Sequence, residues 1–105
     1  MKSEHALSNQ IRIWCGEHNW LAFHINVGKI RLSDGSYFHT GVPVGWPDLT
    51  LITDRGQVIF IETKIKPRKP TEEQIQMLNN LKLRGFIAEV VYNFDDFLAI
   101  LPPKI

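Results

Sequence analysis

A chain of 105 residues, 44% of them hydrophobic and 22% charged, has the size and composition of one globular domain, which we expect to occupy residues 1–105. No apolar run approaches the roughly 20 residues of a membrane span and the N-terminus lacks a signal-peptide core, so we expect a cytoplasmic protein without a membrane partner. The net charge of +1 excludes binding to nucleic acid through overall basicity.

The cysteine and histidine content argues against a disulfide or a zinc site. Cys15 is the only cysteine, and it falls among apolar residues with helical spacing, so we expect it to be packed in a core. The histidines are dispersed along the chain, without the close pairs that zinc sites favour: His5, His18, His24 and His39. A zinc protein is therefore not expected.

The N-terminal segment has the pattern of an amphipathic helix. Ser3 is a suitable N-cap, and the helix should end between residues 17 and 19. Its apolar residues follow helical spacing at Leu7, Ile11, Trp14 and Cys15. Glu4 lies in the first turn, where the helix dipole favours a carboxylate.

A strand and a hairpin are expected next. Residues 20–27 (WLAFHINV) combine bulky and β-branched side chains, and Gly28 is expected to end this strand. Residues 29–32 and 36–39 flank the turn sequence Ser33-Asp34-Gly35, which predicts a hairpin arm.

The side chains of this arm mix cations with an aromatic residue. Lys29, Arg31 and His39 accompany Tyr37. Such a surface suits contact with DNA or with a second copy of the chain, and the sequence leaves both interpretations open.

A loop of small and rigid residues precedes the next strand. Glycines at positions 41 and 45 permit close backbone approach, and Pro47 fixes the chain immediately before Asp48. Trp46 can pack at the edge of the sheet, which we favour, or stack on a splayed base.

A second hairpin is predicted for residues 45–64 (GWPDLTLITDRGQVIFIETK). The apolar runs 49–52 and 58–61 would form its strands, with a glycine in the left-handed position of the tight turn. Glu62 and Lys64 end the second strand, two residues apart, so they point to one face of the sheet.

Two carboxylates and an ammonium group are thereby expected at one end of this hairpin, because Asp48 precedes its first strand. Neighbouring carboxylates repel each other and resist losing water, whereas Mg²⁺ or Mn²⁺ binds such oxygens together with water and phosphate. Lys64 could orient a water molecule or stabilise the charge that develops during phosphoryl transfer. An ordinary hairpin with a surface ion pair is the alternative.

The order Pro47-Asp48 and then Glu62-Thr63-Lys64 resembles the signature of the PD-(D/E)XK nucleases. Its context, Gly-x-Pro-Asp-Leu and Ile-Glu-x-Lys, is similar to the VRR-NUC branch of virus-type replication and repair nucleases, over nearly the whole chain. The resemblance implies that Asp48, Glu62 and the carbonyl of Thr63 bind Mg²⁺ or Mn²⁺ beside a catalytic Lys64.

The resemblance also implies site residues on two helices. A Glu early in the first helix would reach the metal, which matches Glu4, with Glu17 as the alternative. A Gln near the scissile phosphate matches Gln74, although residues 71–74 also form a capping box that explains this Gln without catalysis.

Cations follow the predicted site directly. Lys66, Arg68 and Lys69 come soon after Lys64 and would neutralise a phosphate backbone. The alternative is a solvated loop interrupted by prolines.

The C-terminal third predicts a helix, a strand and a helix. The capping box begins a helix that ends at Gly85, and its sheet-facing residues are expected to be Ile75, Met77, Leu78 and Leu81. Residues 86–92 (FIAEVVY) predict a central or well-covered strand, parallel to 58–61, and Asn93 caps a helix over 94–101. The whole pattern predicts an α/β fold, a central mixed sheet flanked by helices.

These features together predict a metal-dependent DNA endonuclease. Stand-alone viral relatives imply cleavage of branched DNA, such as Holliday junctions, by a homodimer, because a four-way junction offers two symmetric cleavage points. A flap or single-strand nuclease is the alternative within the enzyme class. Outside it, the alternatives are a non-catalytic DNA-binding module or a subunit of a replication assembly.

Overall fold

The computed structural model describes residues 3–25, 27 and 29–103, and these residues form three helices and six strands. The elements follow the chain in this order: α1 (Glu4–Glu17), β1 (Leu21–His24), β2 (Lys29–Arg31), β3 (Tyr37–His39), β4 (Leu49–Ile52), β5 (Val58–Thr63), α2 (Glu72–Leu83), β6 (Ile87–Val91) and α3 (Phe94–Ala99). The predicted order of helices and strands is confirmed. Ser3 caps α1 as expected, accepting a hydrogen bond from the Ala6 amide.

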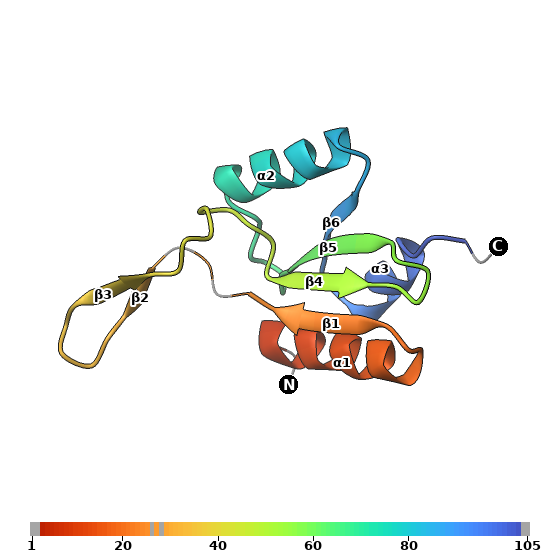
Figure 1. The fold of residues 1–105 in the computed structure, drawn as a ribbon, viewed down its shortest axis with the longest axis horizontal. Helices are drawn as coiled ribbons and strands as arrows, with labels where there is room; N and C mark the ends of the chain where they lie inside the picture. The colour runs from red at the N-terminus through yellow and green to blue at the C-terminus, as the bar shows by residue number, and fades with distance from the viewer. Residues whose placement is uncertain (1–2, 26, 28, 104–105) are drawn as a thin grey trace.

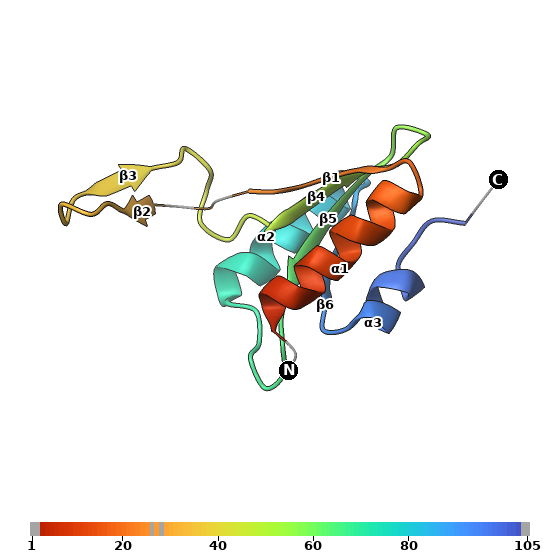
Figure 2. The same cartoon turned by 90° about the horizontal axis from the view of Figure 1, so that it is seen from below.

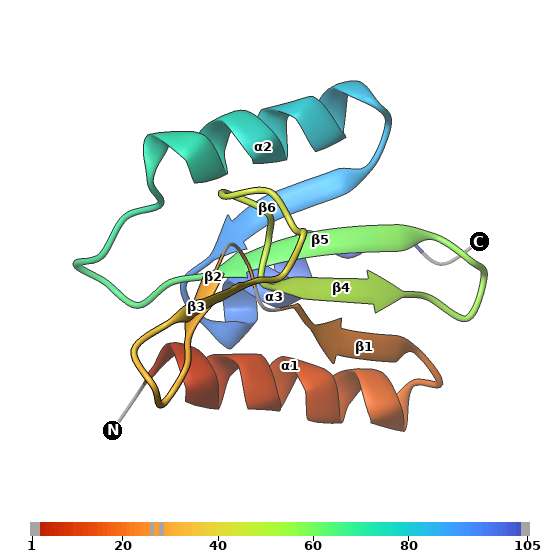
Figure 3. The same ribbon diagram turned by 60° about the vertical axis from the view of Figure 1, so that its left-hand side comes forward.

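Four strands form the central sheet, in the order β1-β4-β5-β6. β4 is antiparallel to both β1 and β5, whereas β6 is parallel to β5 and reaches it through α2 (Figure 3). The sheet is therefore mixed, which confirms the predicted fold class. β6 lies at an edge of the sheet, where α2 and α3 cover it.

Helices cover both faces of this sheet (Figures 1 and 2). α1 and α3 pack on one face around a core of Leu7, Ile11, Cys15, Leu49, Leu51, Ile59, Ile61, Val91 and Phe97. α2 packs on the other face around Phe60, Leu78, Leu81 and Ala88. Alternate residues of β5 therefore serve opposite cores, and Glu62 falls on the same face as Phe60. Within the described part of the chain, no helix is long and apolar enough to cross a membrane.

Cys15 is fully buried in the core beneath α1, as expected. Burial raises the pKa of its thiol to about 11, because an apolar environment disfavours the thiolate. The thiol is therefore a packing group with little nucleophilic character.

The predicted arm is a separate two-stranded sheet that projects from the body of the molecule (Figure 1). β2 and β3 are antiparallel, with Lys29 opposite His39 and Arg31 opposite Tyr37. All the residues of these two strands are exposed. The Lys29 ammonium lies 4.6 Å from the centroid of the Tyr37 ring, a cation–π contact within the arm.

Several strand boundaries differ from those predicted. β1 ends at His24 and does not extend over 20–27; the predicted residue Asn26 and the predicted stop Gly28 lie outside the described residues. β5 continues to Thr63 because it pairs with β6 up to Val91, so Glu62 lies within the strand and not at its end. The arm strands are each one residue shorter than predicted, because the turn begins at Leu32, whose carbonyl accepts a hydrogen bond from the Gly35 amide.

The C-terminal elements are also shorter than predicted. β6 covers Ile87–Val91 and α3 ends at Ala99, ahead of the two prolines at 102 and 103. Ile75 was expected to face the sheet but is 46% exposed. The first turn of α2 contacts the loop at Gly45, so only the later turns of the helix cover the strands.

Candidate active site

Asp48, Glu62 and Lys64 meet at the end of the sheet where β4 begins and β5 ends. The antiparallel register pairs Leu49 with Ile61, which brings the residues on either side of that pair together. The predicted cluster of two carboxylates and an ammonium group is therefore present in the structure.

Thr63 holds the Asp48 carboxylate in place. Its amide nitrogen lies 3.0 Å from Asp48 Oδ1, and its hydroxyl donates to Asp48 Oδ2 at 2.6 Å. Burial raises the pKa of Asp48, while the two hydrogen bonds from Thr63 and the nearby His24 oppose that rise. Asp48 is thus oriented with both oxygens anchored, and the Thr63 carbonyl stays a predicted ligand.

Glu62 is 6% exposed and its carboxylate is costly to ionise. Burial raises its pKa to about 7, the negative charge of Asp48 adds to the rise, and Lys64 opposes it. Gln74 Nε2 donates to Glu62 Oε2 at 3.2 Å, and Lys64 Nζ lies 3.8 Å from the same oxygen. In the metal-free protein, the Glu62 carboxyl group therefore changes its protonation state near neutral pH.

Lys64 is almost completely buried, at 5% exposure. Its amide donates to the Val91 carbonyl at 3.0 Å, so the backbone continues along β6 beyond the end of β5. Lysine is rarely buried to this extent without a partner, and its ion pair with Glu62 is the interaction that accounts for it.

Gln74 links the start of α2 to the site. Its amide and side chain complete the predicted capping box with Thr71, and its side-chain Nε2 also reaches Glu62. The side-chain oxygen of Gln74 thus completes the predicted cap and its nitrogen contacts Glu62, while a place near the scissile phosphate stays a prediction.

Gly45 lets the loop that carries Pro47 and Asp48 touch α2. A Cβ atom at this position would lie 2.5 Å from the Glu73 carbonyl oxygen, and the backbone φ of +91° is one that side chains rarely adopt. Only glycine satisfies both conditions, so this contact fixes the loop against the helix that presents Gln74.

Glu4 lies near the cluster but pairs with another residue. Its carboxylate accepts from Arg68 Nη1 at 2.8 Å, and its charge is the smallest of the effects that raise the pKa of Glu62, after burial and Asp48. Glu17, the alternative, is at the opposite end of α1, about 20 Å along the helix axis. Among residues 3–25, 27 and 29–103, no three His, Cys, Asp or Glu side chains form a ready group for a metal.

An open hollow of about 230 Å³ lies in front of the carboxylates, lined by His24, Ile25, Val27, Gly45, Trp46, Asp48, Glu62 and Gln74. His24, at the end of β1, was not singled out from the sequence. Its register opposite Leu49 places it beside Asp48, and this pairing of β1 with β4 is the signal that could have found it.

Trp46 packs in the structure, as favoured. Its ring contacts Phe60 edge-on, with centroids 5.5 Å apart, and it belongs to the core under α2. Its indole nitrogen is buried without a hydrogen-bond partner among the described residues.

The predicted DNA-binding cations are all exposed, in two places. Lys66, Arg68 and Lys69 lie in the loop after β5, and Lys29 and Arg31 lie in the arm. Arg68 is neutralised by Glu4, whereas Lys66 lies over the Tyr92 ring, 5.6 Å from its centroid.

The architecture is thus a mixed sheet between helices, with a carboxylate and lysine cluster at one end. Among solved structures, the chain is similar to one described as a VRR_NUC domain, with a TM-score of 0.66 and 23% identity, covering 92% of this chain and 91% of that chain. No family model and no curated protein matches the sequence. The chain has the fold of a VRR_NUC domain, and the fold implied by the resemblance is confirmed.

Proposed function

We propose that this protein is a metal-dependent DNA nuclease whose reaction takes place at Asp48, Glu62 and Lys64. The observation that carries the proposal is a pair of neighbouring carboxylates, buried Glu62 and half-buried Asp48, beside the buried Lys64. Burying like charges together destabilises the free protein, and a bound divalent cation would offset that effect. The VRR_NUC fold supports the same class of activity.

The donor atoms at this site fit Mg²⁺ or Mn²⁺. Asp48, Glu62 and the Thr63 carbonyl would provide oxygen ligands, which these hard cations prefer, and Glu4 could join them on leaving Arg68. When bound, the ion would lower the pKa of a water molecule and offset the charge of the scissile phosphate.

The remaining side chains would orient the reactants. Lys64 would position the attacking water and stabilise the negative charge that develops on the phosphate. Gln74 would hold Glu62 in place through its 3.2 Å hydrogen bond and lies close enough to the hollow to approach the phosphate. The role of Thr63 would be to orient Asp48.

We further propose branched DNA, such as a Holliday junction, as the substrate and a homodimer as the active form. The exposed cations of the loop and of the arm, among them Lys29, Arg31, Lys66 and Lys69, support contact with more than one DNA segment. A second copy would double the footprint of a small domain and match the symmetry of a four-way junction.

Cleavage of three labelled DNAs tests this proposal: a four-way junction, a 5′ flap and a plain duplex, each with Mg²⁺, Mn²⁺ or EDTA. We expect cleavage only with the cations, and a loss of at least about 100-fold in Glu62→Gln and Lys64→Met. Lys82→Met is the matched control, because Lys82 is an exposed lysine in the last turn of α2 that pairs with Glu89 of β6.

Each outcome has a distinct meaning. Symmetric nicks in the junction would support junction cleavage by a homodimer. Cleavage of the flap alone would support the nuclease activity but contradict the proposed junction substrate. Tight binding to DNA without cleavage in either cation would contradict the nuclease and favour a binding module.

A further inference from the structure

Tyr92 is joined to the candidate active site through the backbone of the residue before it. It follows Val91, whose carbonyl accepts the hydrogen bond from the Lys64 amide. Its own amide donates to Asp96 at 3.0 Å, which fixes the backbone at the start of α3. The ring is half-buried and forms part of the wall of two separate hollows.

The first hollow lies among the cationic residues of the loop after β5. Lys66, Pro67, Arg68 and Lys69 line it together with Tyr92, and its volume is about 320 Å³. Lys66 and Lys69 make no ion pair within the described residues, whereas Arg68 pairs with Glu4. Two unpaired ammonium groups around an aromatic ring are typical of grooves that follow a single-stranded nucleic acid.

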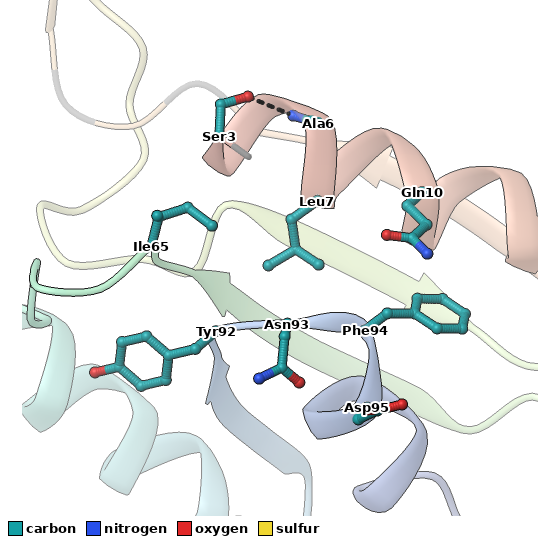
Figure 4. A pocket seen from close by; sticks show the side chains of 9 residues that line it. All are labelled: Ser3, Ala6, Leu7, Gln10, Ile65, Tyr92, Asn93, Phe94 and Asp95. Carbon is teal, nitrogen blue, oxygen red and sulfur yellow. Dashed lines mark hydrogen bonds between the residues drawn. The ribbon is translucent and has the colours of Figure 1, made fainter. Parts of the chain in front are cut away.

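The second hollow is amphipathic and also has a volume of about 320 Å³. Leu7, Ile65 and Phe94 give it apolar surface (Figure 4). Polar groups come from α1 and from the start of α3, and one of them is a carboxylate: Gln10, Asn93 and Asp95. The Gln10 amide makes no side-chain hydrogen bond to any other described residue. A planar heterocycle with polar edges has the matching chemistry.

The Tyr92 side chain is only half-buried, so part of it stays open to both hollows. Figure 4 shows the ring at one end of the second hollow, directed away from Phe94. The ring therefore stands where the basic surface and the amphipathic surface meet.

We propose that Tyr92 and its two hollows bind one unpaired nucleotide of DNA beside the scissile phosphate. The base stacks against Tyr92 and enters the hollow of Figure 4, and the adjoining phosphates contact Lys66 and Lys69. The proposal rests on the proposed nuclease function and narrows its substrate. The protein selects DNA that has an unpaired nucleotide at the branch over fully paired DNA.

Binding in EDTA tests the subsite without cleavage. Fluorescence anisotropy compares a duplex carrying a single-stranded 5′ arm with a fully paired duplex, using wild type, Tyr92→Leu and Tyr92→Phe. We expect Tyr92→Leu to bind the arm-bearing DNA about 5- to 150-fold more weakly and the paired duplex unchanged, since one base loses its stacking partner. Tyr92→Phe should match wild type, because it keeps the aromatic face.

Ala6→Phe is a second variant that removes no core contact. Ala6 is exposed on α1 and lines the hollow of Figure 4, so a larger side chain fills the hollow from outside. We expect the same selective loss of binding to arm-bearing DNA. An abasic nucleotide at one position of the arm should reproduce this loss in wild type and abolish the difference between wild type and Tyr92→Leu.

The results separate the subsite from the nuclease. Unchanged binding of both DNAs in Tyr92→Leu and Ala6→Phe, or an equal loss for both DNAs, would overturn the subsite. If the same variants still cleave the DNA that wild type cleaves with Mg²⁺ or Mn²⁺, the proposed nuclease function stands without the subsite. Selective binding without any cleavage in wild type would leave the subsite and reject the nuclease, and failure to bind any DNA would reject both.

Discussion

At the scale of single residues, Glu62 makes the folded protein sensitive to pH. Its pKa is about 7 in the folded state, mainly through burial, and 4.5 is the ordinary value of the same group. Between these two values the folded protein holds a proton that the unfolded chain has released, so a rise in pH favours unfolding. Ionisation of Glu62 therefore opposes folding in the absence of a cation.

We expect the metal-free protein to lose about 3 kcal/mol of unfolding free energy through Glu62 as pH rises from about 4.5 to 7. Glu62→Gln cannot ionise at this position. The unfolding free energy of the variant, relative to that of wild type, should therefore rise by the same amount over this pH range. Urea unfolding of both proteins in EDTA at pH 5 and pH 8 measures the difference. An equal change of unfolding free energy with pH in the two proteins would show that Glu62 is not the source of the pH dependence.

Two buried threonines on neighbouring strands allow a matched test of how Asp48 is held. The Thr63 hydroxyl donates to Asp48 at 2.6 Å, whereas the buried Thr50 hydroxyl has no partner among the described residues. Thr63→Val should destabilise the protein at pH 8 by about 1.5–3 kcal/mol, since a hydrogen bond to a charged group is lost. Thr50→Val should be neutral or stabilising. Chemical denaturation checks both, and equal effects of the two changes would exclude a special role for the Thr63 hydroxyl.

At the scale of elements, the contact between the loop at Gly45 and α2 decides how the site is assembled. The loop carries Asp48 and the helix carries Gln74, and the loop backbone meets the Glu73 carbonyl where no side chain fits. Two segments far apart in the sequence are thereby fixed at one end of the sheet.

Gly45→Ala should destabilise the protein more than Gly56→Ala does. Both glycines have positive φ, but Gly56 has nothing within 4 Å of an added Cβ, so its change reports backbone strain alone, about 1–2 kcal/mol. At Gly45 we expect about 1–3 kcal/mol more, because the backbone must shift away from Glu73. Thermal or urea unfolding gives both values, and similar losses at the two positions would mean that the loop moves freely.

The sequence predicted elements well where a local pattern determines them. The hairpin from 45 to 64 follows from two apolar runs and a glycine turn, and the capping box of α2 follows from Thr71 and Gln74. The placement of His24 beside Asp48 depends on strand pairing, and the ion pair between Glu4 and Arg68 joins residues 64 positions apart. No local pattern determines such contacts, so the sequence left both unassigned.

At the scale of the whole molecule, the arm is nearly independent of the body. β2 and β3 pair only with each other, form a sheet of their own and expose every residue. Such a short hairpin has little stability by itself, so the arm adds little to the stability of the body.

Replacement of residues 29–39 by a short Gly-Ser linker should therefore change the thermal midpoint by less than about 4 °C, which corresponds to about 1 kcal/mol. Circular dichroism measures the midpoint, and a large fall would show that the arm supports the body. Sedimentation velocity and DNA binding of the shortened protein then separate the two roles predicted for the arm, because loss of the dimer and loss of DNA affinity are independent results.

The burial of Cys15 provides an internal probe of how often the core opens. The chain has one cysteine, fully enclosed beneath α1, with its thiol pKa raised to about 11. A thiol reagent can reach it only in molecules whose core has transiently separated, so the labelling rate follows the population of that open state. Slower labelling on addition of Mg²⁺ or of a DNA oligonucleotide would then measure how strongly each ligand binds the closed molecule, in native buffer and without denaturant.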